Sequence, residues 1–365
     1  MSDSESPLEH GGNIAAVSQA YGIARSQWLD LSTGINPYPY PVGDLPAELF
    51  QQLPYQSEAF RQAVTAYYGG HEWVAGNGSQ QFIALLPKVL PALPVLLPDL
   101  GYQEHERFWR FNANALQHYP AFSLQQATQA IDRALQQNPA QHLVVINPNN
   151  PSGLLLSTNQ LIAWANQLQG GSLIVDEAFI DATSNTNFNT NPNPNASLLQ
   201  PAQPELPENV IVLRSFGKFF GLAGVRLGFA FGHQKNGALR ALKQWVGPWN
   251  INGAAQALAQ KALTDYAWQQ HNRTRLDGLM ASSKAAIQPL VAALNCEGQA
   301  HQPLYSSYLF DTPVVDFLFD AFCQQGILLR KIQHSGPHSL LRVGRYDLAH
   351  EARFKNAVLD VTQRL

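Results

Sequence analysis

Short apolar segments alternate with helical patterns through the middle of the chain, from about residue 70 to residue 232. The segments that predict strands are rich in Val, Ile and Leu, and they are 95–97, 143–146, 173–175, 210–213 and 227–231. Strands that alternate with helices pair in parallel, because each helix returns the chain to the same edge of the sheet. The sequence therefore predicts an α/β fold with a mostly parallel sheet.

The two ends of the chain follow other patterns. The helices predicted there are 14–21, 57–68, 254–294 with a break near Gly278, and 314–325. The predicted strands are 304–310, 327–331 and 340–343. We expect an N-terminal arm with part of a small domain at 1–45, a large α/β domain at 46–250 and a small α+β domain at 251–365. The Asn- and Pro-rich segment 185–209 is predicted to be an exposed loop without a chemical role.

The composition excludes several classes of protein. Charged residues make up 13% of the 365 residues and the net charge is −3, so no basic surface for nucleic acid is indicated. The two cysteines, Cys296 and Cys323, cannot form a cysteine zinc site. We expect no metal, no membrane span and no signal peptide, and therefore a cytoplasmic enzyme. Motifs for ATP binding and for serine hydrolases do not occur.

One lysine lies among side chains that suit a phosphate. Lys218 follows the apolar run 210–213, with Ser215 three residues before it and Arg226 eight residues after it. A Schiff base to pyridoxal 5'-phosphate (PLP) needs an amine nucleophile, phosphate anchors and close backbone approach, which glycines near the lysine permit. The alternative interpretation is a glycine-rich turn with a surface lysine.

Two further polar segments follow predicted strands. The turn 147–153 contains two Asn-Pro pairs, whose prolines make it rigid enough to aim an Asn side chain. Asp176 follows strand 173–175, where a buried carboxylate needs a cationic partner such as a protonated pyridine nitrogen. A plain Asn-Pro turn and an Asp-Glu pair without chemistry are the alternatives.

Together these segments resemble the fold-type I PLP enzymes of the class I/II aminotransferase superfamily, especially its histidinol-phosphate aminotransferase branch. The matching segments are Asn-Pro-x-Asn-Pro-x-Gly at 147–153, Asp-Glu-Ala-Phe at 176–179, and Ser-x-x-Lys at 215–218 with Arg226. The resemblance extends from about residue 30 to the C-terminus. It implies a large PLP-binding domain with a mostly parallel sheet and a smaller α+β C-terminal domain.

The resemblance also implies catalytic roles. Lys218 would form the Schiff base and carry protons, and Asp176 would pair with the pyridine nitrogen of the cofactor. Asn150 would hydrogen-bond the 3'-oxygen of the ring, and Tyr102 would stack on the ring.

Further residues would bind the cofactor phosphate and the substrate. The phosphate would be held by Gly78, Ser79, Gln80, Ser215 and Arg226. Tyr55 would reach the cofactor phosphate of the neighbouring subunit in a homodimer, and Arg342 would grip the substrate carboxylate bidentately.

Two positions depart from the pattern of the family. Many relatives have tyrosine where this chain has Phe179, and a hydroxyl residue where it has Gly217. Each change removes a hydrogen bond, which we expect to alter the pKa of the Schiff base and the grip on the cofactor.

Four segments resemble one branch of the superfamily, the L-threonine-O-3-phosphate decarboxylases. They are 10–13, 30–37, 102–105 and 215–220. The resemblance implies decarboxylation of L-threonine O-3-phosphate to (R)-1-aminopropan-2-yl phosphate in cobalamin biosynthesis. Candidate anchors of the substrate phosphate are His10, Ser32, Thr33, Gly34 and Arg330. A histidinol-phosphate aminotransferase or a related aminotransferase is the first alternative, and a catalytically idle binding protein is the second.

Overall fold

Two compact units make up the structure, a computed structural model that describes residues 10–183, 197–199, 205–334 and 336–365. The large unit comprises Ile35–Gly278 and Gln302–Leu304. The small unit comprises Met1–Gly34, Leu279–His301 and Tyr305–Leu365. The domain boundaries that we placed at residues 45 and 250 from the sequence stay predictions.

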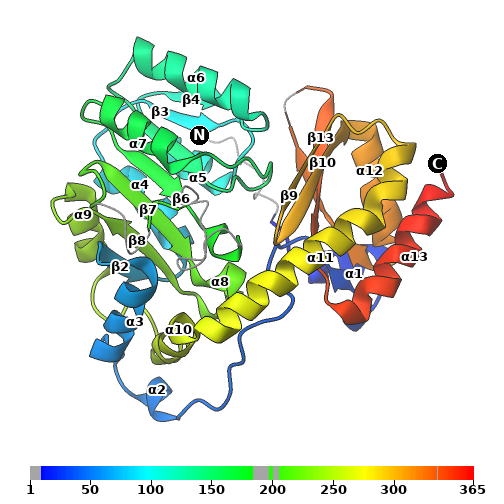
Figure 1. Ribbon diagram of the computed structural model, residues 1–365, viewed down its shortest axis with the longest axis horizontal. Helices are drawn as coiled ribbons and strands as arrows, with labels where there is room; N and C mark the ends of the chain where they lie inside the picture. Colours follow the sequence, from blue (N-terminus) through cyan, green and yellow to red (C-terminus); the bar gives the residue numbers. More distant parts are fainter. Residues whose placement is uncertain (1–9, 184–196, 200–204, 335) are drawn as a thin grey trace. The chain divides into compact units, whose positions relative to one another are not determined.

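A seven-stranded sheet forms the middle of the large unit (Figure 1). Its strands are β2 (Glu72–Gly76), β3 (Val95–Pro98), β4 (Leu116–Tyr119), β5 (His142–Ile146), β6 (Leu173–Asp176), β7 (Val210–Ser215) and β8 (Gly228–Gly232). Their order is β2-β8-β7-β6-β5-β3-β4. Strand β8 is antiparallel to both neighbours, and the other pairs are parallel. The predicted α/β fold with a mostly parallel sheet is confirmed.

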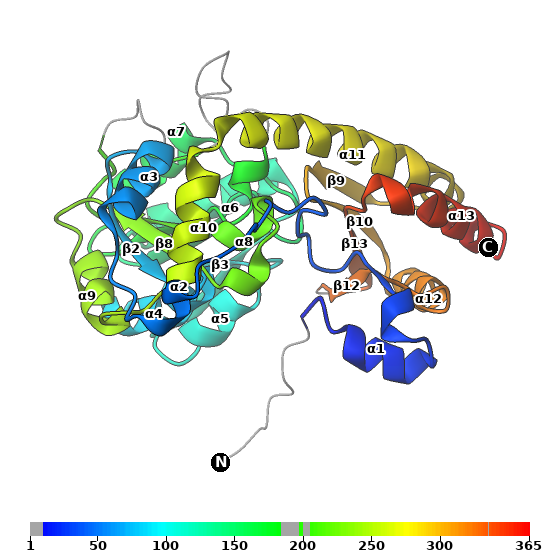
Figure 2. The same ribbon diagram turned by 90° about the horizontal axis from the view of Figure 1, so that it is seen from below.

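Helices cover both faces of this sheet. Figures 1 and 2 show α7 (Thr158–Gln167) on one face and α4 (Ser79–Val89) on the other. The other helices that lie wholly in the large unit are α2 (Glu48–Gln51), α3 (Glu58–Tyr68), α5 (Glu104–Trp109), α6 (Leu124–Gln137), α8 (Phe216–Phe219), α9 (Gly237–Val246) and α10 (Gly253–Thr264). Helix α3 begins as the sequence predicts, because the Ser57 hydroxyl accepts the Phe60 N–H at 3.1 Å.

The apolar face of α4 anchors it to the sheet. Phe82 and Leu86 lie one turn apart and belong to one buried cluster with Ile211 of β7 and Ala230 of β8. Each large side chain buried in this way contributes about 1.5–3 kcal/mol. The packing therefore holds the first turn of α4 at a fixed place beside the ends of β2 and β8.

The small unit is built around a four-stranded sheet of order β12-β13-β10-β9. Its strands are β9 (Gly298–Gln302), β10 (Tyr305–Asp311), β12 (Arg330–Gln333) and β13 (His338–Gly344), and β1 (Leu29–Asp30) pairs in parallel with β11 (Ile327–Leu328). Its helices are α1 (Ile14–Tyr21), α12 (Thr312–Cys323) and α13 (Glu351–Thr362). Phe354 and Val358 of α13 join Leu341 and Val343 of β13 in its core. The predicted small α+β part is confirmed.

Two local predictions are wrong. The sequence of residues 71–75, which lacks the second histidine of a zinc-protease helix, predicts a surface turn, but these residues contain the edge strand β2, which pairs with β8 and buries Val74 and Ala75. Helix α11 (Tyr266–Ala293) continues through Gly278 without a break. Nothing lies within 4 Å of a Cβ built on Gly278, and one exposed glycine costs a helix only about 1 kcal/mol.

A third prediction is wrong in part. Residues 185–196 and 200–204 of the predicted exposed loop lie outside the described residues, but Ser197, Leu198 and Leu199 are buried. The Glu177 carboxylate accepts the Ser197 hydroxyl at 2.7 Å and the Leu198 N–H at 2.9 Å. This short segment is therefore tied to the end of β6.

No helix among the described residues is long and apolar enough to cross a membrane.

Candidate functional site

Asp176 lies at the carboxyl end of β6, and its carboxylate is 3% exposed. One oxygen, Oδ2, lies 2.9 Å from Nε2 of His105, and the other accepts the Ala178 N–H at 3.1 Å. A buried carboxylate requires hydrogen-bond donors, and the tautomer of His105 with its proton on Nε2 supplies one. His105 lies in the segment 102–105 that matches the family, but its contact with Asp176 joins residues 71 positions apart and was not predicted.

Tyr102 is held by a chain of side-chain hydrogen bonds. Its hydroxyl donates to Oε1 of Gln80 at 3.0 Å, and Nε2 of Gln80 donates to Glu104 at 2.9 Å. Arg107 lies 3.3 Å from the other oxygen of Glu104, which is itself buried. The side chain of Gln80 thus fixes the position of Tyr102, a role that the sequence did not predict.

Lys218 lies in the short helix α8, with its amine 5.2 Å from the centre of the Phe179 ring. The ring face attracts a cation, so Phe179 offers the amine a π surface where many relatives offer a hydroxyl. A Cβ built on Gly217 would lie 2.8 Å from Cα of Ala223. Only glycine fits there, so close backbone approach explains the second departure from the family pattern.

The residues predicted to hold the cofactor phosphate converge around Gly228. A Cβ on Gly228 would lie 2.2 Å from the backbone nitrogen of Ser79, the first residue of α4, and Ser215 is paired with Gly228 in the sheet. The Arg226 guanidinium approaches Gly78, where a built Cβ would lie 2.8 Å from Nη2. The N–H groups of Ser79 and Gln80 at a helix start, a hydroxyl and a guanidinium form a donor set that fits a phosphate dianion.

The turn 147–153 is locked by its own asparagines. Asn147 donates to the Leu156 carbonyl at 3.1 Å, and Asn149 donates to the Leu100 carbonyl at 2.6 Å. Both asparagines are buried, whereas Asn150 is half-buried. The structure therefore separates two asparagines that hold the turn from Asn150, the predicted cofactor ligand.

A buried ion network lies next to Asp176 and Ser215 along the chain. Nη1 of Arg214 is 2.7 Å from Asp181, and Nε of Arg214 is 3.2 Å from Glu177, with all three side chains at most 5% exposed. Burial raises the pKa of Glu177, whereas Arg214 acts in the opposite direction. The two acids raise the pKa of Arg214 although burial opposes its charge. Since Glu177 follows Asp176 and Arg214 precedes Ser215, the network fixes the ends of β6 and β7.

In the small unit, two arginines face each other across neighbouring strands. Arg342 of β13 is paired with Arg330 of β12 and, on its other side, with Ser307 of β10. Burial lowers the pKa of Arg342 to about 10, and the charge of Arg330 acts in the same direction. Like charges directly opposite in a sheet repel, so this pair is suited to an anionic ligand.

The segment after His10 packs against Ser32, one of the predicted anchors of the substrate phosphate, and all of these residues belong to the small unit. The Gly12 N–H donates to the Ser32 hydroxyl at 2.8 Å, and that hydroxyl donates to Asp30 at 2.6 Å. Arg342 also donates to the Ser32 carbonyl. The other two residues predicted here are Thr33 and Gly34, which follow Ser32 directly. The structure thus brings the chain at His10 beside Ser32 and its neighbours.

Tyr55 lies on the surface of the large unit, 73% exposed. Its ring packs edge-on against Trp249, with 5.8 Å between ring centres, and Phe50 and Leu53 nearby in sequence are also exposed. Exposed aromatic side chains of this kind favour contact with another protein surface.

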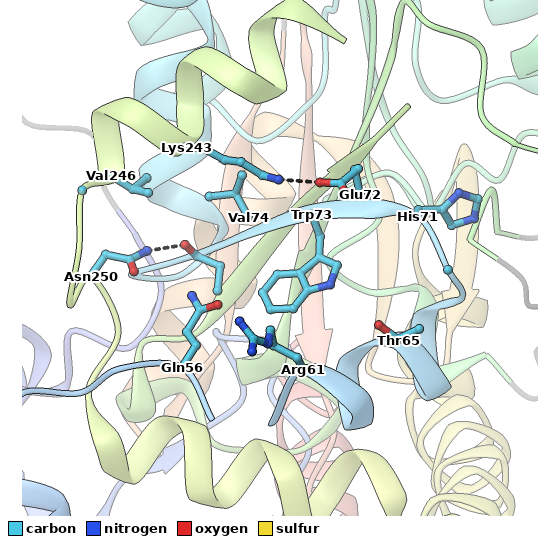
Figure 3. Close-up of a pocket in the computed structure, with 13 residues that line it drawn as sticks. Gln56, Arg61, Thr65, His71, Glu72, Trp73, Val74, Lys243, Val246 and Asn250 are labelled. Carbon is cyan, nitrogen blue, oxygen red and sulfur yellow. Dashed lines mark hydrogen bonds and ion pairs between the residues drawn. The ribbon is translucent and has the colours of Figure 1, made fainter. Parts of the chain in front are cut away.

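A pocket of about 490 Å³ lies along the edge strand β2 in the same unit, and Figure 3 shows its lining. The Trp73 indole points toward Gln56 and Arg61, and Lys243 pairs with Glu72 on the opposite side. None of the predicted site residues lines this pocket.

Comparison with known proteins identifies the class. The chain belongs to the aminotransferase class I and II family, whose model matches residues 45–344. It is an enzyme of this PLP-dependent family, and the resemblance drawn from the sequence is confirmed.

Among curated proteins, the chain is 35% identical over 357 residues to the threonine-phosphate decarboxylase of Pseudomonas aeruginosa, covering 96% of this chain and 97% of that protein. It is 31% identical to the threonine-phosphate decarboxylase of a Sinorhizobium species, covering 98% of both. It is also 28% identical to histidinol-phosphate aminotransferase 1 of Mesorhizobium japonicum, covering 97% of this chain and 95% of that protein.

Solved structures share the fold. A histidinol-phosphate aminotransferase from Sinorhizobium meliloti in complex with pyridoxal-5'-phosphate matches with a TM-score of 0.77 at 16% identity, covering 100% of this chain and 99% of that one. The L-threonine-O-3-phosphate decarboxylase from Porphyromonas gingivalis matches with a TM-score of 0.70 at 15% identity, covering 91% and 99%.

Proposed function

We propose that this chain is a PLP-dependent decarboxylase that converts L-threonine O-3-phosphate to (R)-1-aminopropan-2-yl phosphate and CO2. It would act in the cytoplasm, in cobalamin biosynthesis. The observation that carries the proposal is the pairing of Arg330 with Arg342 across two strands of the small unit. L-threonine O-3-phosphate has two anionic groups, a carboxylate and a phosphate, whereas histidinol phosphate has one. The two similar threonine-phosphate decarboxylases support the same reaction.

The proposed cofactor sites follow from the donor sets of the large unit. The phosphate of PLP would lie against Gly78 and be held by the first N–H groups of α4 at Ser79 and Gln80 and by Ser215 and Arg226. The ring would be held by Lys218, Asp176, Asn150 and Tyr102. When bound, PLP supplies an electron sink for the bond that breaks at the substrate Cα.

In this proposal the protein controls protons through two residues. Asp176, whose oxygens are held by His105 and the Ala178 N–H, would face the cofactor nitrogen and keep a proton on it. The amine of Lys218, which lies over the Phe179 ring, returns a proton to Cα after CO2 has left.

The arginines decide which bond breaks. The bond at Cα that stands perpendicular to the cofactor ring is the one that is cleaved, so the orientation of the substrate selects decarboxylation or transamination. Arg342 would grip the carboxylate and Arg330 the phosphate, with His10, Ser32, Thr33 and Gly34 as further candidate phosphate anchors. Two fixed anionic groups leave little rotation about Cα.

We also propose that the enzyme is a homodimer in which Tyr55 reaches the cofactor phosphate of the neighbouring subunit. The high exposure of Tyr55 and its contact with Trp249 support this assignment, because they present an apolar surface with a hydroxyl at its edge. No nucleic acid and no membrane are proposed as partners.

An aminotransferase is the second candidate, since the same lysine, aspartate and arginine serve either reaction and a keto acid such as 2-oxoglutarate is itself a dianion. The test is substrate consumption by PLP-loaded protein with and without 2-oxoglutarate. We expect L-threonine O-3-phosphate to be consumed equally in both. Consumption of histidinol phosphate only in the presence of 2-oxoglutarate would establish the aminotransferase instead.

A further inference from the structure

The loop 247–252, which joins α9 to α10, contains a strained residue. Among the described residues, Arg226 and Trp249 are the two that are not glycine and have a positive φ, at 58° and 59°. A bulky residue rarely adopts this conformation, which persists only where the surrounding structure imposes it. Contacts with the rest of the unit must therefore hold the loop in this shape.

Two asparagines after Trp249 fix the loop to the rest of the large unit. The Asn250 side-chain amide donates to the Ala75 carbonyl near the end of β2, as Figure 3 shows. The Asn252 side-chain amide donates to the Val225 carbonyl at 3.5 Å. Between them, Ile251 is 2% exposed and anchors the loop in the apolar interior.

Both carbonyls belong to residues that precede the proposed phosphate ligands. After Ala75 the chain turns at Gly76, whose carbonyl accepts the Gly78 N–H at 2.8 Å, and α4 then begins with Ser79. Val225 directly precedes Arg226. The loop is thus bonded to the chain just before the helix start and just before the guanidinium.

The place of β2 in the sheet explains why such a contact matters. Strand β2 is an edge strand with β8 as its one neighbour, so a peptide group on its outer side depends on a side chain or on water. The spacing beyond it is tight, because a Cβ on Gly228 would lie 2.2 Å from the Ser79 nitrogen. A small rotation of the peptide after Ala75 would therefore misdirect the first N–H groups of α4.

We propose that the loop 247–252 braces the phosphate cradle and that Asn250 is a positioning residue for the cofactor phosphate, acting through the Ala75 carbonyl. The inference rests on the proposed function in one respect, namely that PLP binds with its phosphate at the start of α4.

The test compares PLP with pyridoxal, which has the same ring and aldehyde but no phosphate. Dissociation constants are measured from the absorbance of the bound cofactor for the wild-type protein, Asn250→Ala and Asn250→Leu. Loss of one orienting hydrogen bond should reduce the preference for PLP over pyridoxal about five-fold in each variant. Asn250→Leu keeps a side chain of similar shape and removes the donor without adding a charge, so it tests the same bond where Asn250→Ala folds poorly.

Asn209→Ala is the matched control. Asn209 is half-buried in the same unit and donates to the Ala165 carbonyl at 2.7 Å, so its loss should leave the preference unchanged. Equal weakening of PLP and pyridoxal by the Asn250 variants would make the loop merely structural and overturn the brace. A wild-type protein that binds PLP no better than pyridoxal would overturn the cradle and, with it, the cofactor site of the proposed function.

Discussion

Among the described residues each unit buries two arginines, and the surroundings of Arg214 and Arg342 differ. In the large unit Arg214 lies between Glu177 and Asp181, which raise its pKa. In the small unit Arg342 is paired with Arg330, and burial lowers its pKa to about 10. The charge of Arg214 is balanced by carboxylates of the protein itself, whereas the repulsion between Arg342 and Arg330 is relieved when an anion binds between them. Burial of an arginine therefore does not distinguish a structural role from a ligand-binding role, but the charge of its neighbours does.

The largest expected effect concerns stability. Arg214→Ala leaves two buried carboxylates without their cation, which should lower the free energy of unfolding by about 3–5 kcal/mol. Arg342→Ala removes one of two like charges together with a donor to the Ser32 carbonyl, and should lower the free energy of unfolding by only about 1–2 kcal/mol. Denaturant unfolding of both variants measures the difference. Equal losses in the free energy of unfolding would contradict the different roles assigned to the two arginines.

The second prediction concerns catalysis. Arg342→Lys keeps the charge but loses the planar fork that grips a carboxylate, so kcat/KM for L-threonine O-3-phosphate should fall about 100-fold, about 2.7 kcal/mol. The free energy of unfolding should stay unchanged. Steady-state kinetics measure this change. An unchanged kcat/KM in the variant would show that Arg342 does not bind the substrate.

A smaller effect is expected at the partner arginine. Arg330→Ala should raise KM for L-threonine O-3-phosphate about ten-fold and weaken inhibition by inorganic phosphate by a similar factor, because one charge-assisted contact is lost. A raised KM with unchanged phosphate inhibition would show that Arg330 does not contact the phosphate.

The smallest effect is the response of the small unit to acid. Burial, with Lys284 and Arg345, lowers the pKa of His301 from 6.5 to about 4. Since the unfolded chain binds the proton more readily, stability is complete above pH 6.5 and falls as the pH decreases toward 4. Because His301 is only half buried, we expect a loss of about 1 kcal/mol. The free energy of unfolding is measured at several pH values between 7 and 4.5, and it should depend less on pH in His301→Gln than in the wild type. An unchanged pH dependence in the variant would assign the effect to another group.

Much of the fold could be predicted because its signals are local. The five central strands are continuous apolar runs, and the predicted bounds differ from the observed ones by at most two residues. Strand β2 was missed because its exposed first residue, Glu72, and the glycine at its end, Gly76, give this short segment a turn-like sequence. The antiparallel direction of β8 has no local signal, since it depends on how the chain returns to the sheet.

The candidate site could be predicted where a residue type and a spacing coincide, as for Lys218 and Asp176. Its supporting contacts could not, because His105 meets Asp176 across 71 positions and Arg214 meets Asp181 across 33. The departure at Gly217 has a physical cause that only coordinates reveal, namely the close approach of Ala223.

The most direct measurement follows the carboxylate carbon of the substrate. PLP-loaded protein is given L-threonine O-3-phosphate labelled with ¹³C at the carboxylate, without any keto acid, and Lys218→Ala serves as the control. Our account predicts sustained release of labelled CO2, far beyond one equivalent per subunit and equal to the amine formed, and none from the variant. Retention of the label in a keto-acid product, or release from Lys218→Ala at the wild-type rate, would contradict it.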